Sequence, residues 1–356
     1  SDKPPEMTMA AEPVRPPAQR TTWPRYKLDG EEIDVVDMHL HAGSFGALAA
    51  GQRRAIAMFT PPFLLPFLPA FTNGVSDAWT TGLGMLPQAQ RAGIAHAVIY
   101  AVWTPYTTGW FANDSLSQLL YDARNVERED GRRFAYGLAS IFLDDFDQAS
   151  VRSARCAALA SFLEKQGDRM IGIKLAHIHQ RVRLDDVNTK CIFEAAKKYG
   201  KPVAMHTGLT PSPGALNDPS AYDPKFFESM VKLYPEVTFI LLHVGQGDRR
   251  ATNSALDLAG RYMNVALEIS ALGRPMSIDE TGAMVMSMEP QFLYVLSEIK
   301  KRGLVDRTLW GSDGPQTPGF PAQYLDRLVT EMKNQGYTKE QLKSILAGNF
   351  YRVFKL

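Results

Sequence analysis

The segment VVDMHLHAGSFG, Val35 to Gly46, joins a short apolar run to two histidines that are one residue apart. Successive side chains of a β-strand point to opposite faces, so Asp37, His39 and His41 share one face and the residues between them share the other. Two imidazoles on one face at the end of a strand are explained better by a bound metal ion than by packing. The segment therefore predicts a buried first strand that ends in a pair of metal ligands.

Similar apolar runs recur along the chain and alternate with segments that have helical patterns. Most of these runs are almost continuously apolar, which is typical of parallel strands covered on both faces. Eight strands are predicted, over residues 33–41, 95–103, 133–141, 170–176, 201–206, 237–243, 264–270 and 307–313. Helices are predicted between them, for example over residues 191–200 and 223–235.

This βα alternation predicts an α/β fold, namely a (β/α)8 TIM barrel, and an open doubly wound sheet is the rival. The rival is weakened because no GxGxxG sequence follows the first strand. We expect residues 1–30 to form a Pro-rich N-terminal tail and residues 31–356 to form the barrel domain. Residues 42–93 are too many for a simple loop, so they predict a long insertion or lid after the first strand.

The composition excludes several classes of protein. Lys and Arg total 39 and Asp and Glu total 38, so the formal net charge is +1 and no basic run marks a nucleic-acid surface. No uninterrupted apolar run reaches the roughly 18 residues of a membrane-spanning helix. We therefore expect a small-molecule substrate, no nucleic-acid partner and no transmembrane segment, and a homodimer stays open.

Cysteine usage and the start of the chain bear on the compartment. Cys156 and Cys191 are the two cysteines, which excludes a disulfide scaffold and a Cys-type zinc site, and we expect two buried thiols. The chain begins SDKPPEMTMAAEPVRPP without an initiating Met, which predicts a processed or truncated N-terminus followed by a Pro-rich tether. Export, with or without a lipid anchor, and simple truncation both fit, so cytoplasmic and periplasmic locations stay open.

The most apolar segment is FTPPFLLPFLPAF, Phe59 to Phe71. Its four prolines exclude a continuous helix. We expect a lid packed on the rim of the barrel. A dimer contact, an apolar entrance and a shallow membrane contact are the alternatives.

Further polar side chains end later strands, where TIM barrels build their active sites. His206 ends the fifth strand, His243 the sixth and Asp313 the eighth. Together with the first pair they offer nitrogen ligands and a carboxylate, which suit Zn²⁺ or another divalent ion such as Mn²⁺. His96 begins the second strand, at the opposite end of the barrel, and is predicted to be structural.

A second histidine pair follows the fourth strand in GIKLAHIHQ, Gly172 to Gln180. If Lys174 points into the barrel, strand parity turns His177 and His179 away from it unless the strand has already ended. We therefore interpret AHIH as a loop. His177 and His179 remain candidates for substrate contact rather than for metal binding.

The whole pattern resembles the amidohydrolase superfamily. Its short sequence motifs are similar to those of the amidohydrolase-related branch, which contains metal-dependent hydrolases and nonoxidative decarboxylases. The resemblance rests on His-x-His on the first strand, Lys on the fourth, His on the fifth and sixth, and Asp on the eighth. It also rests on GIKL at residues 172–175, GSDGP at 311–315 and GNFYRVF at 348–354. It spans residues 33–356 and departs from the branch at Ala176-His177, where His-Pro is common.

The resemblance implies one metal ion held by His39, His41, His206 and Asp313. Asp313 would take the proton from a metal-activated water and deliver it to the leaving group, and His243 would hydrogen-bond the water or the oxyanion. A second ion would require carboxylated Lys174 as a bridge, with His243 as a further ligand. The leading hypothesis is hydrolysis of an ester, lactone or amide of a small carboxylate-bearing substrate. Nonoxidative decarboxylation of an aromatic or muconate-like carboxylate, and a catalytically silent ligand-binding barrel, are the alternatives.

Substrate-binding candidates are the arginines and aromatic residues that follow strands. Arginine suits bidentate recognition of a carboxylate. The candidates are Arg181, Arg183, Arg249, Arg250 and Arg274, Glu268 and Ser270 on the seventh strand, and Trp103, Tyr106 and Trp110 after the second.

Overall fold

The computed structural model describes residues 3–14, 23–43, 53–54, 57–67, 82–121, 133–210, 212–272, 276–286, 291–314 and 319–356. Eight of its strands form one parallel sheet, in the order β14-β11-β10-β9-β8-β7-β4-β3. These strands are β3 (Val36–His41), β4 (His96–Tyr100), β7 (Ala135–Ser140), β8 (Met170–Leu175), β9 (Val203–Gly208), β10 (Phe239–Gln246), β11 (Val265–Glu268) and β14 (Thr308–Leu309). Each falls within or overlaps one of the eight predicted strands.

The sheet closes on itself between its first and last strands. Leu40 of β3 forms a parallel bridge to Gly314, which follows β14. The Asp313 amide donates to the His39 carbonyl at 2.9 Å, and the His41 amide donates to the Gly314 carbonyl at 2.9 Å. This closure confirms the TIM barrel and excludes the open doubly wound sheet.

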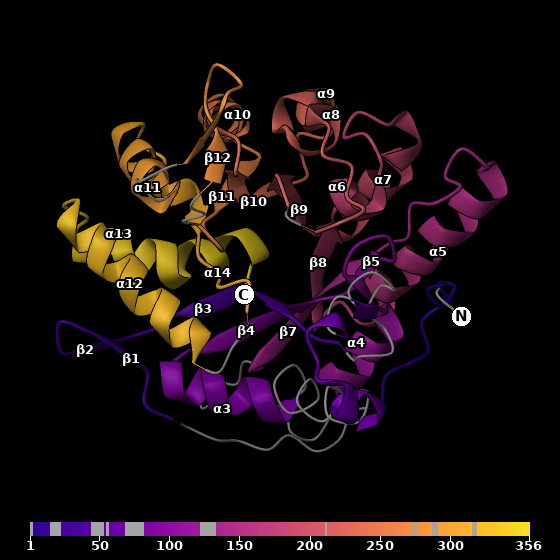
Figure 1. Cartoon of the computed structure of the whole chain (residues 1–356), viewed down its shortest axis with the longest axis horizontal. Coiled ribbons are helices and arrows are strands. Elements are labelled where there is room, and N and C mark those ends of the chain that lie inside the picture. Colours follow the sequence, from indigo (N-terminus) through magenta and orange to yellow (C-terminus); the bar gives the residue numbers. More distant parts are fainter. Residues whose placement is uncertain are drawn as a thin grey trace.

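Helices surround the barrel on its outer side (Figure 1). They are α3 (Gly82–Ala92), α4 (Asn113–Leu120), α5 (Ala149–Lys165), α6 (His177–Gln180), α7 (Lys190–Tyr199), α8 (Pro219–Tyr222), α9 (Glu228–Leu233), α10 (Arg249–Arg261), α11 (Gln291–Lys301), α12 (Phe320–Asn334), α13 (Lys339–Lys343) and α14 (Asn349–Phe354). Short helical turns are η2 (Pro62–Phe67), η3 (Val187–Thr189), η4 (Pro224–Phe227), η5 (Val305–Arg307) and η6 (Ser344–Gly348). Three small hairpins pair β1 (Tyr26–Leu28) with β2 (Glu31–Ile33), β5 (Val102–Thr104) with β6 (Gly109–Phe111), and β12 (Met276–Ile278) with β13 (Met284–Met286).

The two predicted helices have different outcomes. Helix α7 ends at Gly200, whose left-handed φ of 63° closes the helix as the sequence predicts. The helix predicted over residues 223–235 is instead split into η4 and α9. Its first turn is a tighter 3-10 turn that starts at Pro224 and is capped by Asp223, whose side chain accepts from the Lys225 amide.

The barrel interior holds its own apolar cluster. Inward-facing residues of the strands, such as Met38 and Leu242, pack with Phe350 and Phe354 of α14. His96 lies buried at the start of β4, with its Nδ1 2.5 Å from the Arg133 carbonyl and its ring 6.0 Å from that of Tyr351. The chain therefore seals the end of the barrel where strands begin, and His96 lies buried at this end, away from the site, as predicted.

The prediction of two buried thiols is wrong. Cys156 of α5 and Cys191 of α7 form a disulfide, with their Cα atoms 6.1 Å apart. The two helices are 35 residues apart at these positions, but they cover adjacent strands of the barrel and pack against each other. The sequence alone does not place them side by side, because neighbourhood around a barrel is a property of the closed sheet.

Loss of this disulfide should lower the stability of the protein. A cross-link that closes a loop of 35 residues is expected to add about 3–4 kcal/mol to the free energy of unfolding by restricting the unfolded chain. Denaturant unfolding with and without a thiol reductant measures this difference. The double variant Cys156→Ser/Cys191→Ser is the control and should match the reduced protein and not respond to reductant. An unchanged unfolding midpoint after verified reduction would contradict the prediction.

The described part of the N-terminal segment, residues 3–14, lies against the barrel rather than extending from it. The Ala10 amide donates to Ser161 Oγ at 3.1 Å, and Lys165 Nζ donates to the Ala10 carbonyl at 2.8 Å. Trp103 Nε1 donates to the Pro5 carbonyl at 3.1 Å. These contacts hold the segment along α5 and the β5–β6 hairpin, where a free tether was expected.

The described part of the apolar segment after β3 does not pack on the barrel as a lid. Phe59, Phe63 and Phe67 are 84%, 75% and 66% exposed. The end of the segment, residues 68–71, and most of the remaining insertion lie outside the described residues. Among the described residues, no helix has the length and apolar character needed to cross a membrane.

Candidate metal centre

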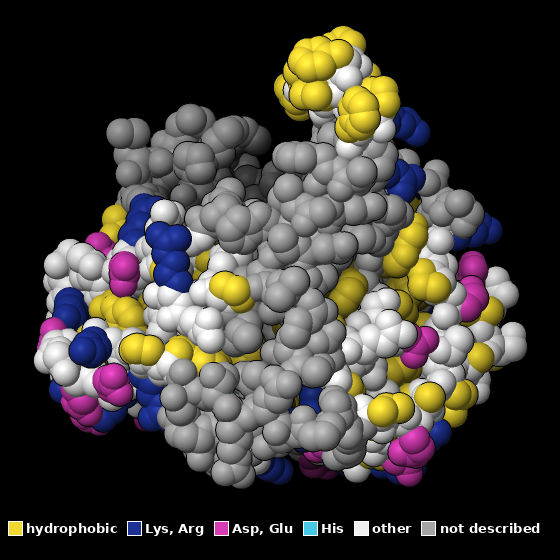
Figure 2. Space-filling model, turned by 90° about the horizontal axis from the view of Figure 1, so that it is seen from below, with side chains coloured by type: hydrophobic (Ala, Val, Ile, Leu, Met, Phe, Trp, Pro, Cys, Tyr) yellow, Lys and Arg dark blue, Asp and Glu magenta, His cyan; other side chains and the backbone are white. Residues whose placement is uncertain are grey.

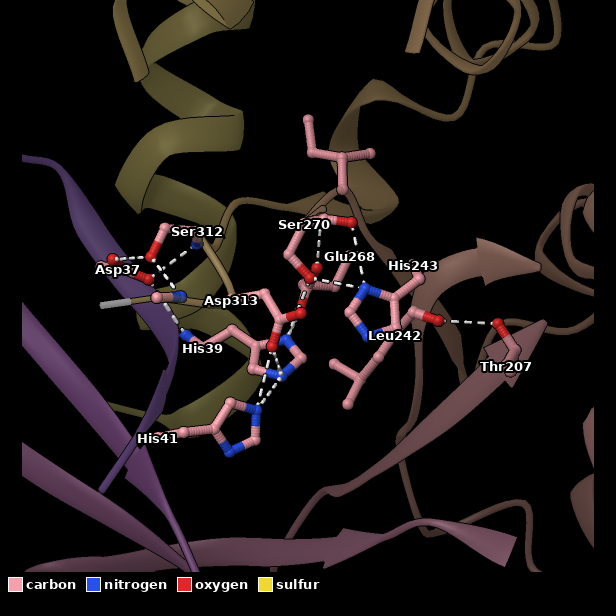
Figure 3. A network of polar contacts seen from close by, with 12 residues as sticks. Asp37, His39, His41, Thr207, Leu242, His243, Glu268, Ser270, Ser312 and Asp313 are labelled. Carbon is pink, nitrogen blue, oxygen red and sulfur yellow. Dashed lines mark hydrogen bonds and ion pairs between the residues drawn. The ribbon is translucent and has the colours of Figure 1, made fainter. Parts of the chain in front are cut away.

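Three of the predicted ligands converge at the carboxyl end of the barrel (Figure 3). The Nε2 atoms of His39 and His41 are 3.1 Å apart. Asp313 Oδ1 lies 3.1 Å from His39 Nε2 and 2.9 Å from His41 Nε2. Atoms bound to one tetrahedral zinc at 2.0–2.1 Å lie roughly 3.3 Å from one another. The three side chains are therefore spaced as ligands of one ion would be.

The protonation of His39 supports the same conclusion. His39 Nδ1 lies 2.5 Å from Glu268 Oε2 in a fully buried contact, and an ionised carboxylate can only accept a hydrogen bond. Nδ1 therefore carries a proton, and in the neutral ring the lone pair of Nε2 faces the Asp313 carboxylate. A lone pair and a carboxylate at this distance repel each other unless a proton or a metal cation lies between them.

Burial and neighbouring charges have opposite effects on the pKa values of His39 and Asp313. Burial opposes the charged form of His39, but the charges of Asp313 and Glu268 outweigh it and raise the pKa of His39. Burial likewise opposes ionisation of Asp313, yet His39, His41 and His243 hold the pKa of Asp313 well below its usual range. The carboxylate is therefore ionised at neutral pH and is available to a cation.

A hydrogen-bonded layer lies behind these ligands. His243 Nδ1 is 3.0 Å from the Ser270 carbonyl, which can only accept, so Nδ1 carries the proton and Nε2 keeps its lone pair. Ser270 Oγ lies 3.0 Å from Nδ1 of both His39 and His243, and the Ser270 amide donates to Glu268. Although His39, His243 and Glu268 are close enough to form a second ligand group, His39 Nδ1 is already hydrogen-bonded to Glu268 and His243 Nδ1 to the Ser270 carbonyl. This layer orients the imidazoles.

A buried carboxylate joins the first strand to the last loop. Asp37 Oδ1 accepts from the amides of His39 at 3.2 Å and Ser312 at 2.9 Å, and Asp37 Oδ2 accepts from Ser312 Oγ at 2.6 Å. The chain passes so close to His39 at Gly311 that a Cβ there would lie 2.6 Å from the Cβ of His39. These contacts fix the spacing between His39 and Asp313.

Two of the site residues adopt an unusual backbone conformation. His243 has a φ of 66° and Asp313 a φ of 62°, in the left-handed region that non-glycine residues seldom enter. Val244, next to His243, has a φ of 47°. Strained backbone of this kind persists where the surrounding structure enforces it, and it is common at functional sites. It turns both side chains at the ends of their strands.

Lys174 and Tyr100 form the floor of the site. The Tyr100 ring stacks on His39, with 4.5 Å between ring centroids, and Lys174 Nζ lies 5.0 Å from the centroid of Tyr100. Burial lowers the pKa of Lys174 to about 8, although Asp313 and Glu268 act in the opposite direction. Lys174 thus points into the barrel, which is the condition under which strand parity turns His177 away from it.

His206 does not join the other three ligands. Its Nε2 lies 3.0 Å from the Gly208 carbonyl, so it donates a hydrogen bond there instead of offering a lone pair to the cluster. Its ring is 4.9 Å from that of His243 and 5.1 Å from that of His179. His206 therefore lines the same site, one side chain away from the converged ligand atoms.

The second histidine pair is divided between site and core. The segment predicted as a loop is the short helix α6, and its turn brings His179 back toward the barrel. His179 Nδ1 lies 2.7 Å from Thr107 Oγ1 of the β5–β6 hairpin. His177 is fully buried beside Phe227, with 6.4 Å between ring centroids, and neither ring nitrogen has a hydrogen-bond partner among the described residues. The structure thus gives His179, but not His177, a place beside the site.

Replacing His177 by Leu should stabilise the protein and leave its activity unchanged. Burial lowers the pKa of His177 to about 4, from 6.5. The unfolded chain therefore binds the extra proton first as pH falls, and the wild type should lose up to about 3 kcal/mol of unfolding free energy between these two pH values. At neutral pH the variant should gain about 1–2 kcal/mol, because no buried nitrogen is left without a partner.

Denaturant unfolding above and below this pH window measures both effects. The variant should lose this part of the pH dependence. A destabilised variant at neutral pH, or one with altered catalysis, would contradict the placement of His177 in the core.

Most of the arginines proposed for substrate binding are already paired. Arg181 Nε donates to the Gly214 carbonyl at 2.7 Å and its guanidinium lies 4.5 Å from the centre of the Tyr106 ring. Arg249 stacks on Tyr294 at 3.5 Å. Arg183 pairs with Asp185, and Arg250 with Asp248. Arg274 lies outside the described residues.

Two other substrate candidates are placed differently from the prediction. Both carboxylate oxygens of Glu268 are bonded, one to His39 and one to the Ser270 amide, so Glu268 orients a ligand. Trp103 is buried and its indole donates to the N-terminal segment. Neither contact could be read from the sequence, because each partner lies far away along the chain.

Sequence reasoning also missed residues of the site. Asp37 was predicted to share the face of His39 and His41, but the register of β3 shifts between Asp37 and Leu40, and Asp37 lines a small cavity with Leu40 and Ala89 of α3 instead. Its partner Ser312 was not foreseen. Tyr100 and Thr107 carried no signal, since an aromatic residue within a strand and a threonine in a hairpin are ordinary.

A closed parallel barrel with polar side chains gathered at the carboxyl ends of its strands defines a TIM-barrel enzyme. The amidohydrolase family model matches residues 36–356, and the chain belongs to this family. It is an enzyme of the amidohydrolase superfamily, many of whose members bind a divalent metal, and the His and Asp groups described above are suited to one. A search of curated proteins found no significant match.

Solved structures share the fold at low sequence identity. An uncharacterised TIM-barrel protein from Bordetella bronchiseptica has a TM-score of 0.61 at 16% identity, covering 91% of this chain and 99% of that one. 5-Carboxyvanillate decarboxylase from Sphingomonas paucimobilis has a TM-score of 0.55 at 14% identity, covering 91% and 100%. A probable 2-pyrone-4,6-dicarboxylic acid hydrolase from Acinetobacter baumannii has a TM-score of 0.53 at 13% identity, covering 91% and 100%.

Proposed function

We propose that the protein is a metal-dependent hydrolase that cleaves an ester, lactone or amide of a small, carboxylate-bearing organic molecule. The observation that carries this proposal is the convergence of His39 Nε2, His41 Nε2 and Asp313 Oδ1, mutually 2.9–3.1 Å apart. The donor set suits Zn²⁺ or Mn²⁺. His206 would complete it after its ring turns from the Gly208 carbonyl.

A bound divalent cation would supply Lewis-acid polarisation of a carbonyl and a lowered pKa for water. Asp313 would accept a proton, since its carboxylate is held ionised and lies 2.9 Å from His41 Nε2 in the ligand cluster. His243 would act beside it through Nε2, whose lone pair is set by the bond from Nδ1–H to the Ser270 carbonyl. Burial lowers the pKa of His243 to about 4, so the ring is neutral at physiological pH.

With a pKa of about 8, Lys174 is mostly an ammonium group at neutral pH, and its positive charge near Asp313 and Glu268 supports a site with one ion. The same lowered pKa, caused by burial, also increases the fraction of Lys174 that is a free amine. Free amine is the form that reacts with CO₂, so a carboxylated Lys174 with a second ion, bound also by His243, is the alternative. Elemental analysis of protein purified without chelators separates the two, with about one or about two equivalents of metal per chain.

The reaction class is tested with a substrate panel. Small carboxylated esters, lactones and amides are assayed for acid release, and aromatic carboxylates are assayed for CO₂ release. We expect acid release that a chelator abolishes and that added Zn²⁺ or Mn²⁺ restores. Release of CO₂ instead would overturn hydrolysis in favour of nonoxidative decarboxylation. Neither product, with metal bound, would show that the proposed substrate class is wrong.

The disulfide supports a proposed location. Structural disulfides persist in oxidising compartments, so we place the protein outside the reducing cytosol. Trapping of free thiols with an alkylating reagent in intact cells tests this. Fully alkylated Cys156 and Cys191 without prior reduction would overturn the proposed location and leave the proposed reaction untouched.

A further inference from the structure

An exposed apolar tip stands apart from the metal centre. We define it as residues 57–67, which include η2. Its large apolar side chains are open to solvent, with exposed fractions of 78% for Met58, 84% for Phe59, 75% for Phe63, 44% for Leu64, 39% for Leu65 and 66% for Phe67. Figure 2 shows a group of hydrophobic side chains projecting from the body of the molecule, with Lys or Arg side chains beside it.

The stretch of sequence that contains the apolar tip carries basic residues but no acidic ones. No Asp or Glu occurs between Asp37 and Asp77, and Arg53 and Arg54 are the only Lys or Arg residues between them. Arg54 is exposed. A stretch this long without an acidic residue is unusual in a chain that is otherwise balanced between 39 basic and 38 acidic residues. The tip and its flank would therefore be attracted to a negatively charged surface.

The backbone of the tip suits an apolar surrounding. Pro61, Pro62 and Pro66 have no amide hydrogen to leave without a partner. The Thr60 amide donates to the Ala57 carbonyl at 3.1 Å, and the Leu64 amide donates to the Pro61 carbonyl at 2.9 Å. In lipid, each unsatisfied amide costs several kcal/mol. With three prolines and two amides bonded within the turn, the tip brings fewer unsatisfied donors into the interfacial region of a bilayer than an open loop of the same length would.

A lipid surface fits this feature better than another protein surface does. Stable protein interfaces bury ~800 Å² on each partner and match a complementary surface. A projecting tip needs a receiving groove, and a described cavity of about 340 Å³ on this chain is lined by Asp144, Asp145 and Asp147, which disfavour phenylalanine. A bilayer needs no preformed groove, because its lipids move aside for a convex apolar group.

We propose that residues 57–67 insert into the interfacial region of an anionic phospholipid bilayer, with Arg53 and Arg54 facing the headgroups. The 3-10 turn is too short to span a bilayer, so the protein lies on the membrane surface. This inference does not depend on which reaction the metal centre performs.

Co-sedimentation of the full chain with vesicles tests the proposal. Vesicles of phosphatidylcholine alone are compared with vesicles that also contain phosphatidylglycerol. We expect binding to the anionic vesicles, weakened at least about tenfold by Phe63→Ser/Phe67→Ser, because each phenylalanine loses its apolar burial. Arg54→Glu should weaken it by about fivefold or more.

Leu233→Ser/Met263→Ser is the matched control, because these two apolar residues are also exposed but belong to the outer helices and their loops. This control should bind as the wild type does. Failure of the wild type to bind, equal binding to both kinds of vesicle, or unchanged binding by the phenylalanine variant would each overturn the proposal. A dimer in solution that the phenylalanine variant abolishes, without vesicle binding, would instead assign the tip to a second copy of the chain.

Discussion

Replacement of Asp313 by Asn is expected to lower kcat/KM by roughly 10²- to 10⁴-fold, the range for loss of a group that transfers a proton in the reaction. The side chain keeps its size, but it loses the charge that faces His39 and His41 at 3.1 and 2.9 Å. Asn tolerates the left-handed backbone at this position, where φ is 62°. The fold should therefore survive, and metal content should fall together with activity.

Asp145→Asn is the matched control for this variant. Asp145 has the same substitution chemistry and a φ of 59°, but it is exposed on the loop after β7 and is not part of the ligand cluster. Steady-state kinetics and elemental analysis are the two measurements. Full activity and full metal content in Asp313→Asn would remove Asp313 from the proposed site.

Replacement of Glu268 by Gln is expected to weaken metal binding by about 10- to 100-fold, the usual effect of losing a carboxylate that orients a histidine ligand. Glu268 accepts from His39 Nδ1–H and from the Ser270 amide. The Gln side chain has one acceptor oxygen, so its NH₂ group must face one of these donors. His39 can relieve that conflict by moving its proton to Nε2, and this removes the lone pair that a metal needs.

The dependence of activity on metal concentration distinguishes Glu268→Gln from Asp313→Asn. Activity of Glu268→Gln should recover as the metal concentration rises, whereas that of Asp313→Asn should not. Glu298→Gln is the control, because Glu298 is a partly buried carboxylate that pairs with Arg302 away from the site. Wild-type metal affinity in Glu268→Gln, measured by competition with a chelating dye, would show that Glu268 does not orient His39.

The sequence predicted the fold because strands and helices of a barrel are local patterns. Each apolar run of four to eight residues marks a strand wherever the sheet finally closes. The same reasoning selected His39, His41 and Asp313 as candidate ligands, because TIM barrels build their sites at the carboxyl ends of strands, and the structure brings these three side chains together.

The remaining features depend on which elements become neighbours. Cys156 and Cys191 meet because α5 and α7 pack together, and Glu268 meets His39 across 229 residues of chain. His179 turns toward the site through α6, where strand parity no longer applies. The exposure of Phe63 depends on which elements come to lie over it, and no local pattern encodes that. Contacts of this kind need the closed barrel before they can be stated.

Closure of the barrel also has a kinetic consequence. The ligand atoms of His41 and Asp313 are 272 residues apart in sequence, and the strands that carry them meet only where the last strand docks on the first. Contacts with such large separation form late in folding, because a long loop must be closed before they contribute. We expect recovery of metal binding during refolding to follow the slowest tertiary phase, as monitored by tryptophan fluorescence and a metal-sensitive dye. A chain stalled before that step would have most of its helices and strands but no place for the ion.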